Sequence, residues 1–454
     1  MSLGKRKTEG QGLWVATTDL PKSPGHPFYQ KLNELLAAAD FDRSVEELCA
    51  PYYADEMGRP SIPPGVYFRM LMVGYFEGIT SQRGIAWRCS DSLSLKAFLG
   101  LMVTESVPDH SSLTVTRKRL PMTVHEAVFQ KVLEIAEERG LVKGKTVSVD
   151  ATTLEANAAM KSIVRRDSGE DWKAFLKRLA EEVGMEDPTD EELRRFDKKR
   201  PNKKVSNDEW VSPTDPDSRI TKMKDGRTHL AYKAEHAVDL ETDMVVAVQV
   251  HGADEADSET IKETLVGAQA NLIAAGSEAE IKEAVADKGY HKAETLAWCE
   301  SFSVRTYVPE PDGGRRDWTD KPEEWQEATV ANRRRTKGKR GRRLQRLRSE
   351  RVERSFAHCC ETGGARRTWI RGLVEVGKRY VIQAAARNLG LMMRKLFGMG
   401  TPRSLQGSLA AIPCLFCRLP MTLKVLWRLT AAPGDRSCAE ARPLLSRSFE
   451  NTAA

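Results

Sequence analysis

The sequence predicts an α/β protein in which an all-helical N-terminal domain precedes a mixed sheet flanked by helices. Three observations predict this class. Apolar residues recur every three or four positions between about residues 28 and 140. They alternate in TVSVDAT (146–152) and again between 229 and 250, and later strand-like runs alternate with helical ones. The 454 residues exceed one ordinary core, which indicates a large domain with smaller modules.

Composition indicates a soluble globular protein. Hydrophobic residues make up 40% and charged residues 30%, and the net charge of +7 weakly favours polyanionic partners. The eight cysteines are too sparse for a disulfide scaffold, and Cys414 and Cys417 form a lone CxxC that we interpret as structural. The N-terminus has no apolar signal region, and the most apolar segment, 408–427, is interrupted by proline and charge. We therefore expect a cytoplasmic protein without a membrane span.

The N-terminal region is expected to be helical at 28–39, 63–78, 92–100 and 123–140, where Gly140 ends the last helix. A short helix in PDHSSLTVTRKRL (108–120) can be capped by Asp109 or a following serine. Its exposed side is expected to carry Arg117, Lys118 and Arg119. The simpler interpretation is that these three residues only form a solvated face of the helix. The more specific interpretation is that this face lies on the phosphate backbone of DNA.

After Gly140 the period becomes that of a strand, and 157–227 is interpreted as a charged insertion. The insertion contains an amphipathic run from Trp172 to Val183 and a capping box from Thr189 to Glu192. Then follow a hairpin (229–250), a helix (258–276), a strand (283–290), a helix (291–301) and a strand (304–311). The predicted divisions are a disordered tail (1–27), a helical DNA-binding domain (28–140), a catalytic domain (141–398) and an extension (399–454) that is given no function and could be disordered.

A basic run lies inside the chain, in ANRRRTKGKRGRRLQRLRSERVER (331–354). Its twelve Arg and Lys against two Glu give a local net charge of +10, more than that of the whole chain. A solvated tail is one interpretation, but the run leads into a helix, and phosphate backbone is its natural partner. The predicted DNA contacts are Arg333, Arg334, Arg335, Lys337, Lys339, Arg340, Arg342, Arg343, Arg346, Arg348, Arg351 and Arg354.

Two aspartates stand where strands are expected to end, Asp150 after TVSV and Asp287 after EAVA. Either one alone is most simply a cap for the next turn. In one sheet, however, two such strand ends can be neighbours. Carboxylates suit Mg²⁺, and two ions about 3.5 to 4 Å apart can promote in-line displacement at phosphorus.

The third acid is expected in SERVERSFAHCCE (349–361). Val352, Phe356 and Cys359 form a helical stripe that can pack on the sheet, with Glu353 on its margin. Glu350, which stands among arginines, and Glu361, at the helix end, compete with it. Spacing alone leaves this choice open.

The blocks VSVDATTLEANAA, VADKGY and VERSFAH, in this order, resemble those of bacterial insertion-sequence transposases with a DDE triad on a ribonuclease-H-like core. The resemblance covers roughly residues 25–395. It implies that Asp150, Asp287 and Glu353 are the catalytic and metal-binding residues, acting with two Mg²⁺ or Mn²⁺ ions. It also implies cutting and joining of double-stranded DNA, at the element's terminal inverted repeats and at a target, by a homodimer.

The third block departs from the family pattern. Where many relatives have a tyrosine and an arginine before the glutamate, this chain has Arg346 and Ser349, and Cys360 lies near the position of a later lysine. Arginines elsewhere in the run are expected to make the phosphate contacts.

Other readings stay open at this point. The chain could be a DNA-binding remnant or regulator that does not cut, although all three acids are present, or a ribonuclease-H-like nuclease without joining activity. His291 could approach substrate phosphate. Trp318, Trp325 and Trp369 are candidates for stacking on an exposed base, with a place in the core as the simpler interpretation.

Overall fold

The computed structural model describes residues 25–54, 58, 61–200, 206–223, 226–312 and 316–405. The chain up to Pro402 forms one compact unit, and the chain from Arg403 is assigned to a second. The predictions for the tail 1–27 and the extension 399–454 fall mostly outside the described residues. Those for Cys414 and Cys417 lie wholly outside them.

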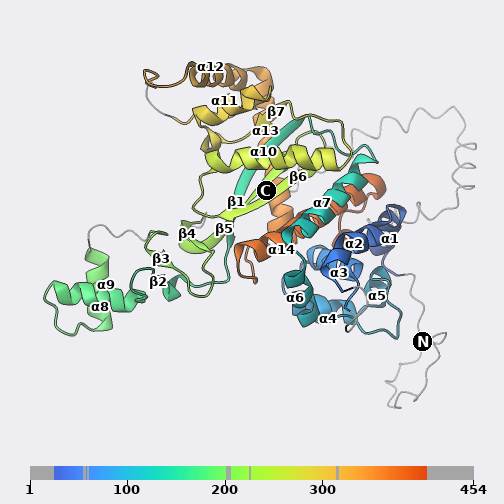
Figure 1. Ribbon diagram of the computed structural model, residues 1–454, viewed down its shortest axis with the longest axis horizontal. Coiled ribbons are helices and arrows are strands. Elements are labelled where there is room, and N and C mark those ends of the chain that lie inside the picture. The colour runs from blue at the N-terminus through green and yellow to red at the C-terminus, as the bar shows by residue number, and fades with distance from the viewer. Residues whose placement is uncertain are drawn as a thin grey trace, which may run out of the picture. The chain divides into compact units, whose positions relative to one another are not determined.

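The N-terminal region is helical, as predicted (Figure 1). Serine and aspartate caps begin several of its helices, and the carboxylate of Asp109 accepts a 2.7 Å hydrogen bond from Ser112 N–H. Gly140, with φ +66°, follows the last helix and lets the chain turn away. The helices are α1 (Pro27–Ala38), α2 (Phe41–Cys49), α3 (Pro64–Glu77), α4 (Gln82–Ser90), α5 (Leu93–Phe98), α6 (His110–Arg119) and α7 (Met122–Glu137).

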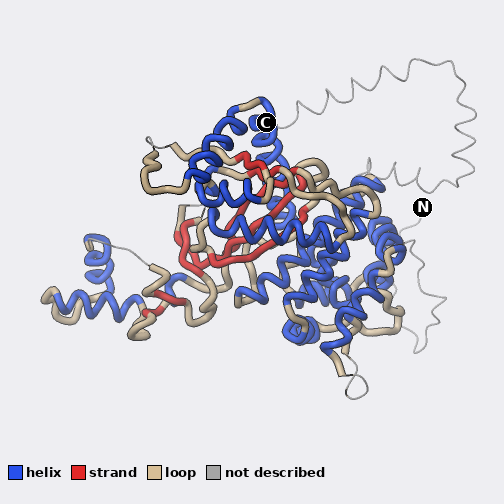
Figure 2. Tube along the Cα trace, turned by 45° about the horizontal axis from the view of Figure 1, so that its top comes forward, coloured by secondary structure: helices blue, strands red, loops and turns tan. Residues whose placement is uncertain are grey.

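A mixed sheet follows, which confirms the predicted fold class (Figures 1 and 2). Its central order is β6-β5-β1-β7-β8, and β4 pairs with the start of β5. Strand β1 runs antiparallel to β5 and parallel to β7, and β7 runs parallel to β8. The strands are β1 (Thr146–Glu155), β4 (Arg219–Lys222), β5 (Thr228–Asp239), β6 (Val245–Gly252), β7 (Glu283–Val285) and β8 (Arg305–Tyr307).

Helices cover both faces of the sheet. On one face, α10 (Asp257–Ala274) packs on β6, β5 and β1. On the other face, α13 (Lys339–Ala357) contacts β1, β5, β7 and β8. The connections from β7 through α11 (Ala293–Ser301) to β8 and then through α12 (Glu323–Lys337) to α13 match the predicted alternation of strands and helices.

Helix α14 (Leu373–Phe397) joins the sheet to the N-terminal helices. It is buried from Val376 to Met393 and packs against α3, α7 and β6. Asn388 fixes it to the sheet, since its side chain bonds both the N–H (3.1 Å) and the C=O (2.7 Å) of Val245. Within the described residues, no helix has the length and apolar character that a membrane span requires.

The insertion folds around a small core of its own. Helices α8 (Trp172–Glu182) and α9 (Asp190–Lys199) pack Leu176, Ala180 and Leu193 together. Trp210, in the two-residue strand β3 (Trp210–Val211), meets Trp172 and Phe175 at ring distances of 5.1 and 5.2 Å. Strand β2 (Val164–Arg165) pairs with β3.

Two predictions for the insertion have opposite outcomes. The capping box from Thr189 to Glu192 is confirmed, with both of its reciprocal bonds present. The inclusion of Val183 in the apolar run is wrong. Val183 is 72% exposed because it stands at the C-cap of α8, beyond the last turn that packs on α9.

We predict that Trp210→Ala opens the insertion while the sheet stays folded. The indole is 2% exposed, and truncating a core tryptophan costs about 3 to 5 kcal/mol, more than so small a core can lose. Limited proteolysis should then cut between 157 and 227 at much lower protease concentration. Val183→Ala is the matched control, and equal resistance of the two variants would contradict the prediction.

Candidate active site

Asp150 lies in the middle of β1 rather than at its end. The expectation of a strand end was wrong because Thr152, Thr153 and their neighbours stay extended and pair with β5 as far as Glu155. The parallel neighbour β7, by contrast, stops at Val285, opposite Ser148. Asp150 therefore stands just beyond the point where the adjacent strand has ended.

Asp287 follows β7 and caps the turn Lys288–Tyr290, its Oδ1 accepting a 2.7 Å hydrogen bond from Gly289 N–H. The parallel register pairs Thr146 with Glu283 and Ser148 with Val285. Two residues further along, the same register brings position 287 level with position 150. Asp150 belongs to the series of β1 that faces α13, whereas Asp287 lies beyond the last residue of β7, in the turn that it caps.

Successive polar residues along α13 contact successive strands on this face of the sheet. Near its start, Arg340 forms an ion pair with the buried Glu283 of β7. Gln345 then donates to the carbonyls of Ala286 (3.1 Å) and Tyr307 (2.6 Å). Arg348 Nη1 donates to Oδ2 of Asp150 at 2.6 Å, with both side chains less than one-fifth exposed. The helix thus passes from β7 and β8 onto β1.

The same helix continues onto β5. His236, the antiparallel partner of Asp150, is fully buried and its Nδ1 lies 2.8 Å from Ser355 Oγ. The ring of Phe356 stacks on the imidazole at 4.2 Å. The stretch between Arg348 and Phe356 is therefore held at both ends on the rung of the sheet that carries Asp150.

Glu353 lies in this stretch. Val352, Phe356 and Cys359 are all buried, as the predicted stripe requires, and Glu353 is exposed at its margin. The two competing glutamates have arginine partners, since Glu350 pairs with Arg354 (2.6 Å) and Glu361 with Arg366 (2.7 Å). Among the described residues Glu353 forms no such pair, which leaves its carboxylate open for another cation.

The donor chemistry of these acids fits a hard divalent ion, because carboxylate oxygens are its preferred protein ligands. One oxygen of Asp150 already holds a cationic group, the guanidinium of Arg348. In this arrangement the described part of the chain contains no set of three His, Cys, Asp or Glu side chains close enough to hold an ion.

A buried polar network on the opposite face anchors the turn after Asp287. The Tyr290 hydroxyl donates to Glu235 Oε1 of β5 at 2.8 Å, and Thr260 and Thr264 of α10 also donate to that carboxylate. Burial raises the pKa of Glu235, and burial beside Glu235 raises the pKa of Tyr290. Sequence analysis missed Glu235, although a charged residue in an otherwise apolar strand could have signalled it.

The basic run divides into two sets. The arginines of one set form ion pairs with acids of the same chain. Arg333 pairs with Glu310, Arg335 with Glu300, Arg340 with Glu283 and Arg348 with Asp150, and both Arg351 and Arg354 pair with Asp243. The other set is exposed and has no ion pair within the described residues: Arg334, Lys337, Lys339, Arg342, Arg343 and Arg346.

In the helix at 110–119, Lys118 and Arg119 are exposed as expected. The expectation that Arg117 is also exposed is wrong. Arg117 is 8% exposed and pairs with Glu375 of α14 at 2.7 Å. A partner 258 residues away in the chain turns this guanidinium inward.

Other predicted contacts are placed as follows. His291 Nδ1 accepts a 3.2 Å hydrogen bond from Arg316, beside a pocket that Trp318 and Trp325 also line. Trp369 is 54% exposed.

Comparison with protein-family models gives the class of this protein. Residues 147–389 match a transposase DDE domain, and residues 19–119 match a second model, described as Transposase domain (DUF772). The first match alone spans more than half of the 454 residues. No curated protein and no solved structure matches the chain.

The chain therefore belongs to the DDE transposase family, whose catalytic domains have a ribonuclease-H-like fold. Both the family and the fold class expected from the sequence are confirmed, and the two domains indicate a function in DNA transposition.

We predict that His236 makes the protein acid-sensitive. Burial lowers the pKa of His236 to about 3 in the folded chain, against about 6.5 when unfolded. The contribution to stability is complete above pH 6.5 and is lost as the pH falls, because the unfolded chain takes up the proton first. Between pH 7 and 5 this histidine should reduce the free energy of unfolding by about 2 kcal/mol.

Denaturant titrations at the two pH values test this. His236→Gln should lower stability overall but show a smaller pH dependence, whereas His110→Gln, at the start of α6, should keep the parent slope. An unchanged slope in His236→Gln would contradict the prediction.

Proposed function

We propose that this protein binds the ends of an insertion sequence, cleaves the DNA there and joins the freed 3′ hydroxyl to target DNA. One observation carries the proposal: Asp150 lies on β1 just beyond the end of β7, Asp287 follows β7 two residues later, and α13, which carries Glu353, crosses the face that holds Asp150. Water and then the DNA hydroxyl are the nucleophiles, so no protein nucleophile is required.

Asp150, Asp287 and Glu353 are the proposed ligands of two Mg²⁺ or Mn²⁺ ions. The chemistry that such ions supply is activation of the attacking oxygen and stabilisation of the leaving one. The protein's own part is to hold the carboxylates. β1 fixes Asp150, the cap of the turn after β7 fixes Asp287, and the anchored stretch of α13 presents Glu353 from above.

Arg348 is proposed to keep Asp150 neutralised until the ion arrives. An isolated carboxylate in this half-buried position would lack compensation, and the guanidinium provides it. When Asp150 turns to an ion, Arg348 is released beside the site and can contact a substrate phosphate. Arg348 would thus bind Asp150 before DNA is bound and a phosphate of the DNA afterwards.

Double-stranded DNA is the proposed macromolecular partner. The exposed set of basic residues on α12 and α13 is proposed to lie along its backbone, together with Lys118 and Arg119 of the helical domain 28–140. The domain 141–398 is proposed to be catalytic. Two element ends must be held together for joining, so the working form is proposed to be a homodimer.

We predict that labelled element ends are nicked and joined in the presence of Mg²⁺ by the parent chain and not by Asp150→Ala. Removing one ligand should lower the rate at least about 1000-fold while DNA binding is kept, because the loss falls on the transition state. Gel analysis of nicked and joined products measures both steps. Binding without nicking by the parent would indicate an inactive remnant, and nicking of RNA–DNA hybrids without joining would indicate a nuclease.

We also predict that Arg348→Met binds Mn²⁺ about tenfold more tightly in the absence of DNA, since the ion no longer competes with a charged hydrogen bond. Calorimetric titration measures the affinity directly. Arg346→Met, on the same helix but exposed and without an ion pair, is the matched control. Equal affinities in the two variants would exclude the proposed competition.

A further inference from the structure

The turn between β5 and β6 contacts both α13 and α14. Two backbone hydrogen bonds close it, from Asp243 N–H to the carbonyl of Asp239 (3.0 Å) and from Asp239 N–H to the carbonyl of Met244 (2.8 Å). Asp243 has φ +67° and is one of four non-glycine residues with a positive φ in the described part of the chain. This conformation suits glycine better than aspartate. A carboxylate kept at such a position indicates that the side chain itself is used.

The carboxylate of Asp243 binds two arginines of α13. Its Oδ1 lies 3.2 Å from Arg351 Nε and its Oδ2 lies 3.1 Å from Arg354 Nη1, and the side chain is only 14% exposed. Because residues three apart lie on one face of a helix, the two ion pairs fix the rotation of α13 about its axis as well as its height. Glu353 stands between these arginines in the chain. The direction in which α13 presents Glu353 therefore depends on Asp243.

The same turn is bound by α14. Nη1 of Arg387 donates to the carbonyl of Asp243, and Nζ of Lys395 donates to the carbonyl of Thr242. Arg387 is 2% exposed, and this burial lowers its pKa, whereas the charge of Asp243 acts in the opposite direction. Asp243 thus lies beside guanidinium groups from two helices. Without its carboxylate these cations would face one another with little water between them.

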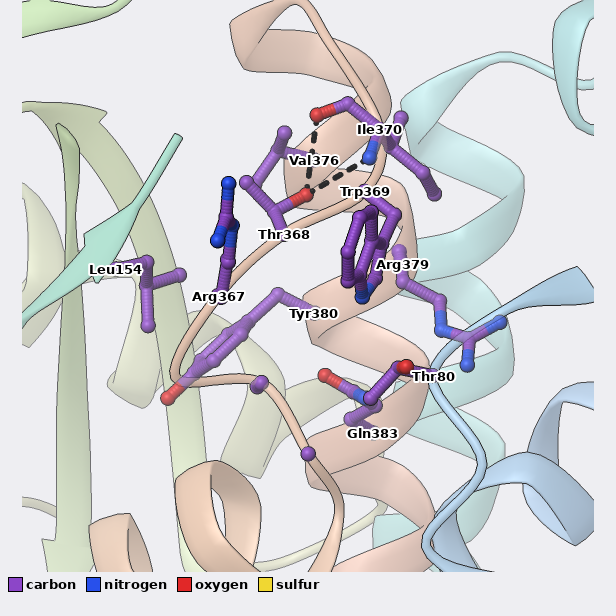
Figure 3. A pocket seen from close by; sticks show the side chains of 12 residues that line it. Thr80, Leu154, Arg367, Thr368, Trp369, Ile370, Val376, Arg379, Tyr380 and Gln383 are labelled. Carbon is purple, nitrogen blue, oxygen red and sulfur yellow. Dashed lines mark hydrogen bonds between the residues drawn. The ribbon is translucent and has the colours of Figure 1, made fainter. Parts of the chain in front are cut away.

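Other contacts hold α14 to the chain that follows α13. Gln383 of α14 donates to the carbonyl of Gly363 at 3.0 Å. The connecting segment is itself fixed, since the Thr368 hydroxyl donates to the carbonyl of Ile370 (3.0 Å) and accepts from its N–H (3.1 Å) (Figure 3). Removing the carboxylate of Asp243 should therefore loosen α13 locally without separating it from α14.

We propose that Asp243 is a positioning residue for Glu353. By holding Arg351 and Arg354, its carboxylate sets the rotation at which α13 presents the third acid to the ions. The assignment rests on the proposed function in taking Glu353 as a metal ligand. It goes further in giving Arg351 and Arg354, which the sequence predicts as DNA contacts, a role inside the protein.

The experiment titrates Mn²⁺ into the full chain by calorimetry. Asp243→Gly keeps the left-handed turn and removes the carboxylate, whereas Asp243→Asn keeps the turn and one oxygen but removes the charge. Both variants should bind Mn²⁺ about 10- to 100-fold more weakly than the parent, as expected when a residue that orients a metal ligand is lost. Glu350→Gln, which removes the other acid paired with Arg354, is the matched control and should keep the parent affinity.

A second titration shows whether Asp243 acts through Glu353. In a Glu353→Gln background, Asp243→Gly should cause no further loss of Mn²⁺ affinity, because the ligand that it positions is already gone. A general loss of stability would instead weaken binding by the same factor in both backgrounds. Circular dichroism first establishes that each variant is folded, and Asp243→Asn serves both comparisons if Asp243→Gly is not.

The outcomes separate this assignment from the proposed function. Parent-like Mn²⁺ affinity in the folded Asp243 variants would overturn the positioning role and leave the proposed function standing. An equal loss of affinity in both backgrounds would do the same. Parent-like affinity in Glu353→Gln alone would remove Glu353 from the metal site, and both proposals would fail with it.

Discussion

The arrangement of this protein depends on how α13 is fastened to the sheet. A helix can slide along a sheet whose surface is uniformly apolar, but polar side chains at defined rungs remove that freedom. Here Arg340 is bound to Glu283, Gln345 to two carbonyls at the ends of β7 and β8, Arg348 to Asp150, and Ser355 to His236. These contacts set both the direction of the helix and its axial position. The location of Glu353 follows from them.

The sheet contributes the complementary constraint. Since β1 is antiparallel to one neighbour and parallel to the other, one strand determines the level of residues on both sides. On the face of α13 this aligns Asp150 with His236, and on the other side β7 ends opposite Ser148, two residues before Asp287. On the opposite face, the hydrogen bond from the Tyr290 hydroxyl to Glu235 ties the turn after Asp287 to β5. Polar contacts on both faces thus fix the part of the sheet that carries Asp150.

Much of this could be predicted from the sequence, because the signals were local. Alternation located the strands, the capping box in the insertion was readable from Thr189 and Glu192, and three separated blocks indicated the family. Two of the errors have one physical origin, contacts between residues distant in the chain. Pairing with β5 extends β1 past Asp150, and Glu375 draws Arg117 inward. The bond from Arg348 to Asp150 joins residues 198 positions apart, so no local pattern encodes it.

Helix α14 has a consequence for synthesis on the ribosome. It is the shared partner of α3, α7 and β6, and Lys378 at its start donates to the carbonyl of Arg117. The helical region therefore leaves the exit tunnel with its apolar surface uncovered and waits for more than two hundred further residues, on the order of ten seconds or longer. A gene copy cut short before residue 373 would yield N-terminal helices that lack their central packing partner. Such a fragment should be degraded or aggregate rather than accumulate and compete for element ends.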